Sequence, residues 1–225
     1  LIIYLTSPHK SINLNRGMFF VAAGMFSVLM LPFIELLFPT WGSFVFDPFH
    51  RHFFTVAPKE EIIKYLSFYL LTRSVKIKNV HPTGIMFYYG MVGLGFAMIE
   101  ILQYVANDGA EVLLVRTFTS TIAHMLFGMF AGYWVAMSKI NSGKYANRSV
   151  FGILMSKHKE LKKLVYSGIG IFSAILYHGL WNYNLSSSKE ASFSIMILML
   201  IIGLVVAKFA SDDLVTKYRR KLRNV

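Results

Sequence analysis

The chain has 225 residues, of which 55% are hydrophobic, and its mean hydropathy is +0.52. Because a soluble globular domain has about 45–50% apolar residues, this composition excludes an ordinary soluble protein and indicates one that lies in a membrane. The net charge is +12, but we expect the basic residues to meet lipid head groups rather than nucleic acid. Cysteine is absent, which excludes disulfides, thiol catalysis and thiolate metal ligands.

Six windows of the sequence predict membrane-spanning helices, since a helix needs about 20 mostly apolar residues to cross a bilayer. The windows are residues 17–38, 57–72, 82–105, 112–137, 164–183 and 192–210. The second window is the shortest and the most polar. Residues 1–5 are an apolar run that starts on Leu1, so we expect one further span on the N-terminal side of this sequence.

The connections between the windows are short, and none is large enough to fold separately. We therefore predict an all-α, polytopic membrane helix bundle that forms a single domain over residues 1–225. Its motif core covers residues 57–184, and residues 211–225 form a basic C-terminal tail. The oligomeric state is not encoded in any pattern that we recognise.

Lysine and arginine residues gather on one side of the predicted membrane. If the first window runs outward from the cytoplasm, most of them fall in cytoplasmic segments, and the exceptions are Arg51, Lys59, Lys64, Arg116 and Lys189. This bias is the positive-inside pattern, and the cytoplasmic basic segments are expected to contact anionic lipid head groups.

Several ionisable or polar side chains lie within the apolar windows. An ionisable side chain near the bilayer centre costs about 2.5–3.5 kcal/mol on insertion scales, so such residues pair, line water or do chemistry. The set is Glu60, Glu61, Lys64, Glu100, His124, His178 and Asn182, with Arg116 one turn inside the fourth window. In the predicted topology His124 lies near the middle of the membrane and the others lie in its outer half, which predicts a cavity open to the extracytoplasmic side.

Helical spacing predicts that these side chains converge, because residues four apart share a helix face. Glu60 shares a face with Lys64, and His178 shares one with Asn182. Arg116, Ser120 and His124 form a similar stripe. Small residues that allow helices to approach closely accompany them; these are Gly93, Gly95, Gly128 and Gly132.

These motifs carry a family resemblance. The order Glu60-Glu61-x-x-Lys64, Phe96-x-x-x-Glu100, a lone His124 and His178-x-x-x-Asn182 resembles the PrsW family of bacterial intramembrane proteases. That family is a branch of the superfamily of type II CAAX-prenyl endopeptidases and bacteriocin-processing proteins. The second motif ends in His in the CAAX branch and in Glu100 here, which favours PrsW.

The resemblance implies which residues act and where. Glu60 and Glu61 would be the paired glutamates of the first motif and Glu100 the acid of the second. His124 would be the histidine of the third motif, and His178 with Asn182 the last. The resemblance also implies site-1 cleavage of a membrane-anchored substrate, such as an anti-sigma factor, at the extracytoplasmic face of the bacterial cytoplasmic membrane.

Two chemical routes fit these residues. In the first, a glutamate in a low-dielectric cavity takes a proton from water; the family pattern favours Glu60 as this base, with Glu61 in support. In the second, a divalent metal such as zinc is held by residues from Glu61, Glu100, His124 and His178, although the HExxH spacing typical of zinc proteases is absent. Lys64 and Arg116 would be supporting residues, and no organic cofactor is expected.

Each residue also has an ordinary structural interpretation. Glu60 and Lys64 suit an ion pair within one helix, His124 suits a core histidine, and His178 with Asn182 suits a polar contact between helices. Glu100 has the weakest structural explanation, because its neighbours in the sequence are apolar. At the level of function, a proton-coupled carrier that uses the acids and histidines as a relay, or a catalytically silent scaffold, are the alternatives to a protease.

Overall fold

A computed structural model describes residues 12–37, 47–74, 80–141, 159–187 and 189–223. The apolar run at residues 1–5 and the part of the predicted cytoplasmic loop at residues 142–158 lie outside the described residues. Within these ranges the chain forms helices and no strand, which confirms the predicted all-α class. The helices are α2 (Leu14–Leu37), α3 (Pro48–His50), the π-helix η2 (Arg51–Val56), α4 (Ala57–Ser74), α5 (Pro82–Asp108), α6 (Val112–Asn141), α8 (Lys159–Ser187) and α9 (Lys189–Arg223).

Five of these helices are long and apolar enough to cross a membrane, namely α2, α5, α6, α8 and α9. They correspond to five of the six predicted windows. The remaining window forms α4, a helix of 18 residues that is not among the apolar spans. It places Glu60, Glu61 and Lys64 in the protein interior. Residues 211–223 of the predicted basic tail continue the helix α9.

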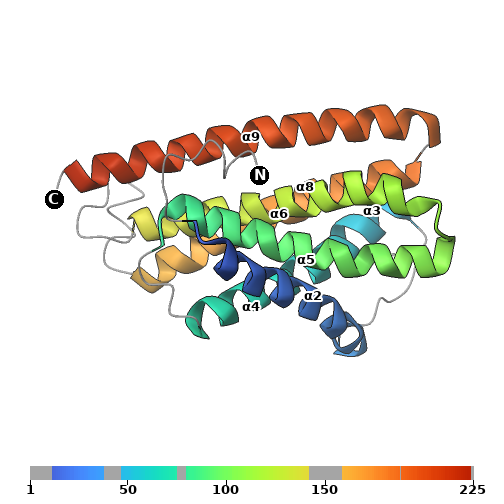
Figure 1. Cartoon of the computed structure of the whole chain (residues 1–225), viewed down its shortest axis with the longest axis horizontal. Helices are drawn as coiled ribbons and strands as arrows, with labels where there is room; N and C mark the ends of the chain where they lie inside the picture. The colour runs from blue at the N-terminus through green and yellow to red at the C-terminus, as the bar shows by residue number, and fades with distance from the viewer. Residues whose placement is uncertain (1–11, 38–46, 75–79, 142–158, 188, 224–225) are drawn as a thin grey trace.

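Helices α5 and α6 form the centre of the bundle and make its most extensive contact. Helix α2 packs against α5, whereas α8 and α9 pack against α6. In Figure 1, α9 runs along one edge of the molecule, and α2 and α4 lie at the opposite edge. Helix α4 contacts both α2 and α8, so that its buried side chains reach the interior between them.

Glycines allow α5 to approach its neighbours closely. A Cβ atom at Gly93 would lie 2.0 Å from the carbonyl oxygen of His124 in α6, and one at Gly95 would lie 1.9 Å from that of Val21 in α2. Gly128 faces the backbone of Tyr89 in the same way. The prediction that small residues permit close helix contact is confirmed at these positions.

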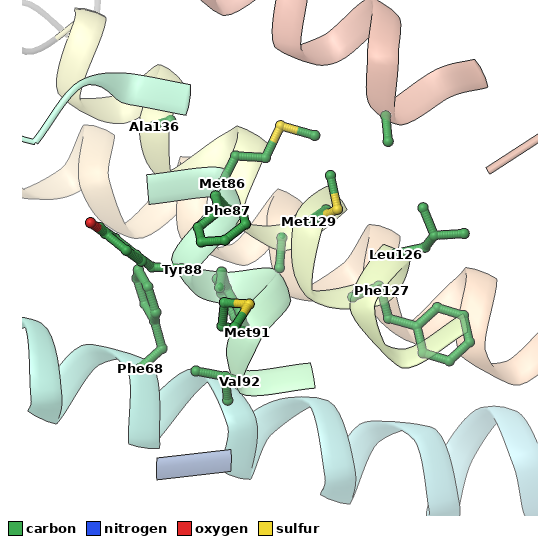
Figure 2. Packing of buried hydrophobic residues seen from close by; sticks show 14 of the residues in the cluster. Phe68, Met86, Phe87, Tyr88, Met91, Val92, Leu126, Phe127, Met129 and Ala136 are labelled. Atoms are coloured by element: carbon green, nitrogen blue, oxygen red, sulfur yellow. The ribbon is translucent and has the colours of Figure 1, made fainter. Parts of the chain in front are cut away.

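The apolar core fills the space between α5 and α6. Figure 2 shows Met86, Met91 and Val92 of α5 near Leu126 and Phe127 of α6. Large apolar side chains also cover much of the outer surface, which is the arrangement expected where the solvent is lipid. Examples are Phe33, Leu36, Leu114, Phe118, Phe172 and Phe209.

One end of the bundle carries most of the described basic residues. Lys139 Nζ near the end of α6 donates to the carbonyl of Val80 just before α5, at 3.0 Å, and Lys221 Nζ near the end of α9 donates to the carbonyl of Ile140, at 2.8 Å. The start of α8 lies there too, because Lys162 Nζ lies 3.4 Å from the carbonyl of Asn141. At the opposite end, Lys59 of α4 forms an ion pair with Glu35 of α2.

Candidate active site

The structure brings the polar residues of four helices together. Glu60, Glu61 and Lys64 come from α4, Glu100 from α5, His124 from α6, and His178 with Asn182 from α8. Glu61, Lys64, His124 and His178 are at most 2% exposed, and the Glu100 side chain is 15% exposed. Such a concentration of buried ionisable groups is costly unless the groups pair or perform a function.

Glu61 orients His178. Lys64 Nζ donates to Glu61 Oε1 at 2.7 Å, and His178 Nδ1 lies 2.8 Å from the same oxygen. A carboxylate can only accept, so the proton of the neutral imidazole lies on Nδ1 and the lone pair lies on Nε2. Asn182 Nδ2, one turn later in α8, lies 3.0 Å from Nε2 and donates to it. Nε2 of His178 is therefore the nitrogen that would serve as a base or a metal ligand once the Asn182 contact is released.

His124 lies between Lys64 and Glu100. Its Nδ1 is 2.9 Å from Lys64 Nζ, and its Nε2 is 2.9 Å from Glu100 Oε2. Because an ammonium group only donates, Nδ1 accepts and Nε2 donates to the carboxylate in this arrangement. Ser120 Oγ also donates to Glu100 Oε2, at 3.3 Å. Two members of the predicted stripe of Arg116, Ser120 and His124 thus contact Glu100.

Aromatic rings surround the two histidines. Lys64 Nζ lies 4.1 Å from the ring centroid of Phe96, and Phe127 stacks on His178 with centroids 4.7 Å apart. The two histidine rings are 5.0 Å apart. These rings limit the access of water, so the charged contacts act in a region of low dielectric, where they are stronger than in water.

Glu60 is the site carboxylate that makes no hydrogen bond with a described residue, whereas Glu61 accepts two through Oε1 and Glu100 accepts from His124. Its Oε2 is buried and has no hydrogen-bond partner, although His178 Nε2 lies 3.7 Å away and Lys64 Nζ 3.9 Å away. A buried carboxylate oxygen without a partner is unfavourable unless a ligand completes it. Glu60 is therefore the acid best placed to take part in chemistry.

Among the described residues, Glu60, His124 and His178 form a group that could hold a metal ion, with one ligand atom from each within 4.8 Å of one another. In a tetrahedral zinc site with bonds of 2.0–2.1 Å, ligand atoms lie about 3.3 Å apart, so binding of the ion would require these atoms to move closer by up to about 1.5 Å. The donors are two imidazoles and one carboxylate, a set found in catalytic zinc sites. The sequence prediction named Glu61 and Glu100 among the ligands, whereas the structure groups Glu60 with the histidines.

Arg116 is placed apart from these contacts. Its guanidinium carbon lies 3.2 Å from the ring centroid of Tyr104, one turn beyond Glu100 in α5, and it makes no ion pair with a described residue. Stacking of this kind holds α5 and α6 together near the site. Its role as a supporting residue is therefore indirect.

Sequence reasoning missed Tyr89. Its hydroxyl is buried and has no hydrogen-bond partner, and it interacts electrostatically with Glu61, whose Oε2 is also buried without a partner. Tyr89, Gly93, Phe96 and Glu100 follow one another at steps of four, three and four residues. This spacing places them on one face of α5, so the helical pattern contained the signal.

Comparison with known proteins gives the family. The family model described as "PrsW family intramembrane metalloprotease" matches residues 15–208, a range that contains every site residue discussed above. This chain belongs to the PrsW family of intramembrane metalloproteases. It is thus an integral membrane protease that acts on a protein substrate, and the carrier and scaffold alternatives are disfavoured.

Individual PrsW relatives agree with this assignment. The chain is 26% identical over 191 residues to Protease PrsW of Oceanobacillus iheyensis, covering 83% of this chain and 80% of the relative. It is 26% identical over 177 residues to Protease PrsW of Shouchella clausii, covering 78% and 74%. No solved structure matches the chain.

Proposed function

We propose that this PrsW-family protein hydrolyses a peptide bond of a membrane-anchored substrate near the extracytoplasmic face, with a divalent metal, zinc, held by Glu60, His124 and His178. The observation that carries the proposal is Glu60 Oε2, a buried carboxylate oxygen without a hydrogen-bond partner beside His178 Nε2. A protease needs an activated water, a donor for the developing oxyanion and an acid for the leaving amine, and residues for each role lie here.

Bound zinc lowers the pKa of a water ligand and polarises the scissile carbonyl. Around that ion, each side chain has a separate task. Glu61 keeps the proton of His178 on Nδ1, so that Nε2 is the nitrogen left to hold the ion. This is the usual contact of a carboxylate with a metal-binding histidine, and it fixes the ring orientation. Lys64 compensates the negative charge of Glu61 with a contact of 2.7 Å.

Proton transfer is assigned to Glu100. With Glu60 as a ligand, Glu100 is the remaining carboxylate that faces His124, at 2.9 Å, and its 15% exposure leaves it within reach of water. It accepts a proton from the attacking water and returns it to the leaving amine. The amide of Asn182, which donates to His178 Nε2, would be free to donate to the oxyanion if that nitrogen held the ion.

The metal-free route uses the same residues with different roles. Glu60 then accepts the proton of the water directly, because its Oε2 is not engaged in a hydrogen bond, and His178 with Asn182 stabilises the oxyanion. Glu61 suits the base role less well, since its Oε1 already accepts from Lys64 and His178. The two routes differ in their response to a chelator.

The basic end of the bundle supports the proposed orientation. Positively charged residues near helix ends favour the cytoplasmic side, and the described ones at that end include Lys139, Lys162, Lys217, Arg219, Arg220 and Lys221. Glu60 lies in the first turn of α4, close to the opposite end. We therefore assign the site to the extracytoplasmic half of a bacterial cytoplasmic membrane and the whole chain to one protease domain, with an anti-sigma factor as a candidate substrate.

Cleavage of a single-span reporter with an extracytoplasmic stub tests the proposal. We expect purified wild-type protein in lipid vesicles to cleave the reporter, the His178→Ala variant to lose at least about 100-fold in rate, and a chelator to abolish cleavage until zinc is returned. Cleavage that survives the chelator but not His178→Ala would support the metal-free route. If His178→Ala left cleavage unaffected, the assignment of this group of residues as the active site would be refuted.

A further inference from the structure

A cleft leads to the site from one side of the bundle. It has a volume of about 490 Å³ and lies between α2, η2, α4 and α5. Its lining residues are Val28, Leu31, Pro32, Glu35, Arg51, Thr55, Val56, Lys59, Glu60 and Gln103. Glu60 is thus shared by the cleft and by the candidate metal group. A substrate in this cleft would lie next to Glu60, the site carboxylate whose nearest polar contacts with described residues are the longest, at 3.7 and 3.9 Å.

The size of the cleft limits what it can hold. One turn of an α-helix with its side chains is about 5.4 Å long and 10 Å wide, or roughly 420 Å³, which is close to the cleft volume. A spanning helix of about 30 Å cannot fit. The cleft therefore accommodates a short segment of a polypeptide rather than a whole spanning helix.

The walls suit such a segment. Val28, Leu31 and Pro32 of α2 form an apolar wall, and Thr55 and Gln103 add polar groups. Pro32 has no N–H, so the carbonyl of Val28 lacks the backbone donor that an α-helix normally supplies four residues later. A substrate segment in an extended conformation offers backbone N–H groups, which can donate to the Val28 carbonyl.

The π-helix η2 connects the cleft with the histidine helix. Arg51, Thr55 and Val56 of η2 line the cleft, and Phe53 packs on α8, where a Cβ atom at Gly179 would lie 2.6 Å from the Phe53 ring. Gly179 directly follows His178. Single π-turns occur frequently at functional sites, and this one holds Arg51 at the cleft while its other face contacts the helix of His178.

The charged side chains of the cleft are not all paired with one another. Lys59 and Glu35 form an ion pair that joins α4 to α2. Arg51 lies in an exposed position and makes no ion pair with a described residue. A guanidinium without an acidic partner at the margin of a peptide-sized cleft is well suited to bind a carboxylate, which it can contact through two parallel hydrogen bonds.

We propose that this cleft binds the substrate segment beside the scissile bond and that Arg51 selects substrates with an acidic side chain in that segment. The proposal rests on the protease function proposed above. Arg51 is a specificity-determining residue in this view, and it does not take part in bond cleavage.

A charge-swap experiment tests the proposal. A set of single-span reporters carries Asp, Ala or Lys at each successive position of the extracytoplasmic segment next to the span. We expect wild-type protein to cleave the Asp reporter about fivefold faster than the Lys reporter, as kcat/KM, at one position along the segment. The Arg51→Glu variant is expected to prefer Lys at that same position.

Arg73→Glu is the matched control. Arg73 is also an exposed arginine, but it lies at the other end of α4, where it stacks on Tyr69. We expect this variant to keep the preference for Asp. The Arg51→Gln variant should cleave all three reporters at similar rates, so it tests the charge without introducing repulsion.

Three results would overturn the proposal. The first is a wild-type enzyme that cleaves the reporters without any charge preference, and the second is a preference for Asp that persists in Arg51→Glu; in both cases the protease function stands. The third is the absence of cleavage of every reporter by the wild type, which would refute the proposed protease function and this inference with it.

Discussion

The ammonium group of Lys64 makes contacts on three sides although it is fully buried. It lies 2.7 Å from Glu61, 2.9 Å from His124 and 4.1 Å from the Phe96 ring centroid. Removing one partner of a buried ion pair leaves an uncompensated charge and is strongly destabilising. At the residue scale, the adjacent glutamates of α4 should therefore differ in what they contribute: Glu61 to stability and Glu60 to chemistry.

This difference is testable with two variants of the same kind. We expect Glu61→Gln to lower the free energy of unfolding by about 3 kcal/mol, because Lys64 then loses its one short carboxylate contact among the described residues and keeps only Glu60, at 3.9 Å. We expect Glu60→Gln to change stability by less than about 1 kcal/mol, since Glu60 Oε2 makes no hydrogen bond, and yet to reduce cleavage at least about 100-fold. Thermal unfolding in detergent and reporter cleavage measure the two effects. Equal destabilisation by both variants would contradict the assignment.

At the scale of elements, the contact of α5 with α6 determines where His124 lies. Gly93 faces the His124 carbonyl so closely that no side chain fits there without separating the helices. Glu100, two turns later in α5, bonds to the His124 ring. The same helix contact thus determines the backbone position of His124 and the partner of its side chain.

Adding one methyl group at this contact should affect both stability and activity. We expect Gly93→Ala to lower the unfolding free energy by about 1–3 kcal/mol through overpacking and to slow cleavage, because α6 must move away. Gly168→Ala is the control, since no described residue outside its own helical turn has an atom within 4 Å of a Cβ atom at Gly168. Alanine is the better helix former, so this control should be neutral or slightly stabilising. If Gly93→Ala and Gly168→Ala had the same unfolding free energy and the same cleavage rate, the close contact at Gly93 would not be what positions His124.

At the scale of the whole molecule, the absence of cysteine makes the orientation directly measurable. A single cysteine can be introduced without removing others. Ser186 is exposed at the end of α8, and Arg219 is exposed near the end of α9. In the proposed orientation these positions lie on opposite sides of the membrane.

We expect a membrane-impermeant thiol reagent to label Ser186→Cys in intact cells. Arg219→Cys should be labelled only after the cells are opened, because the positive-inside pattern places the basic end of α9 in the cytoplasm. A gel-shift assay measures the fraction of each cysteine variant that is labelled. The reverse pattern would place the candidate site on the cytoplasmic side and would exclude an extracytoplasmic substrate segment.

The sequence by itself determined the helical class, five of the spanning helices and the order of the polar motifs. Hydropathy and helical period are local properties, so they can be read along the chain without knowledge of its partners. The close glycine contacts and the stripe of Ser120 with His124 were predictable for the same reason. The family resemblance rested on the order of the motifs, and the match over residues 15–208 confirms it.

Only the tertiary structure decided which faces meet. Glu60 and Glu61 are adjacent, and neighbours on a helix point about 100° apart, so their different partners depend on how α4 lies between α2 and α8. The same packing placed Arg116 over Tyr104 and brought Arg51 into one cleft with Glu60. The packing also brought the short, polar helix α4 into the interior. Its charged side chains Lys64 and Glu61 contact His124 of α6 and His178 of α8 as well as each other.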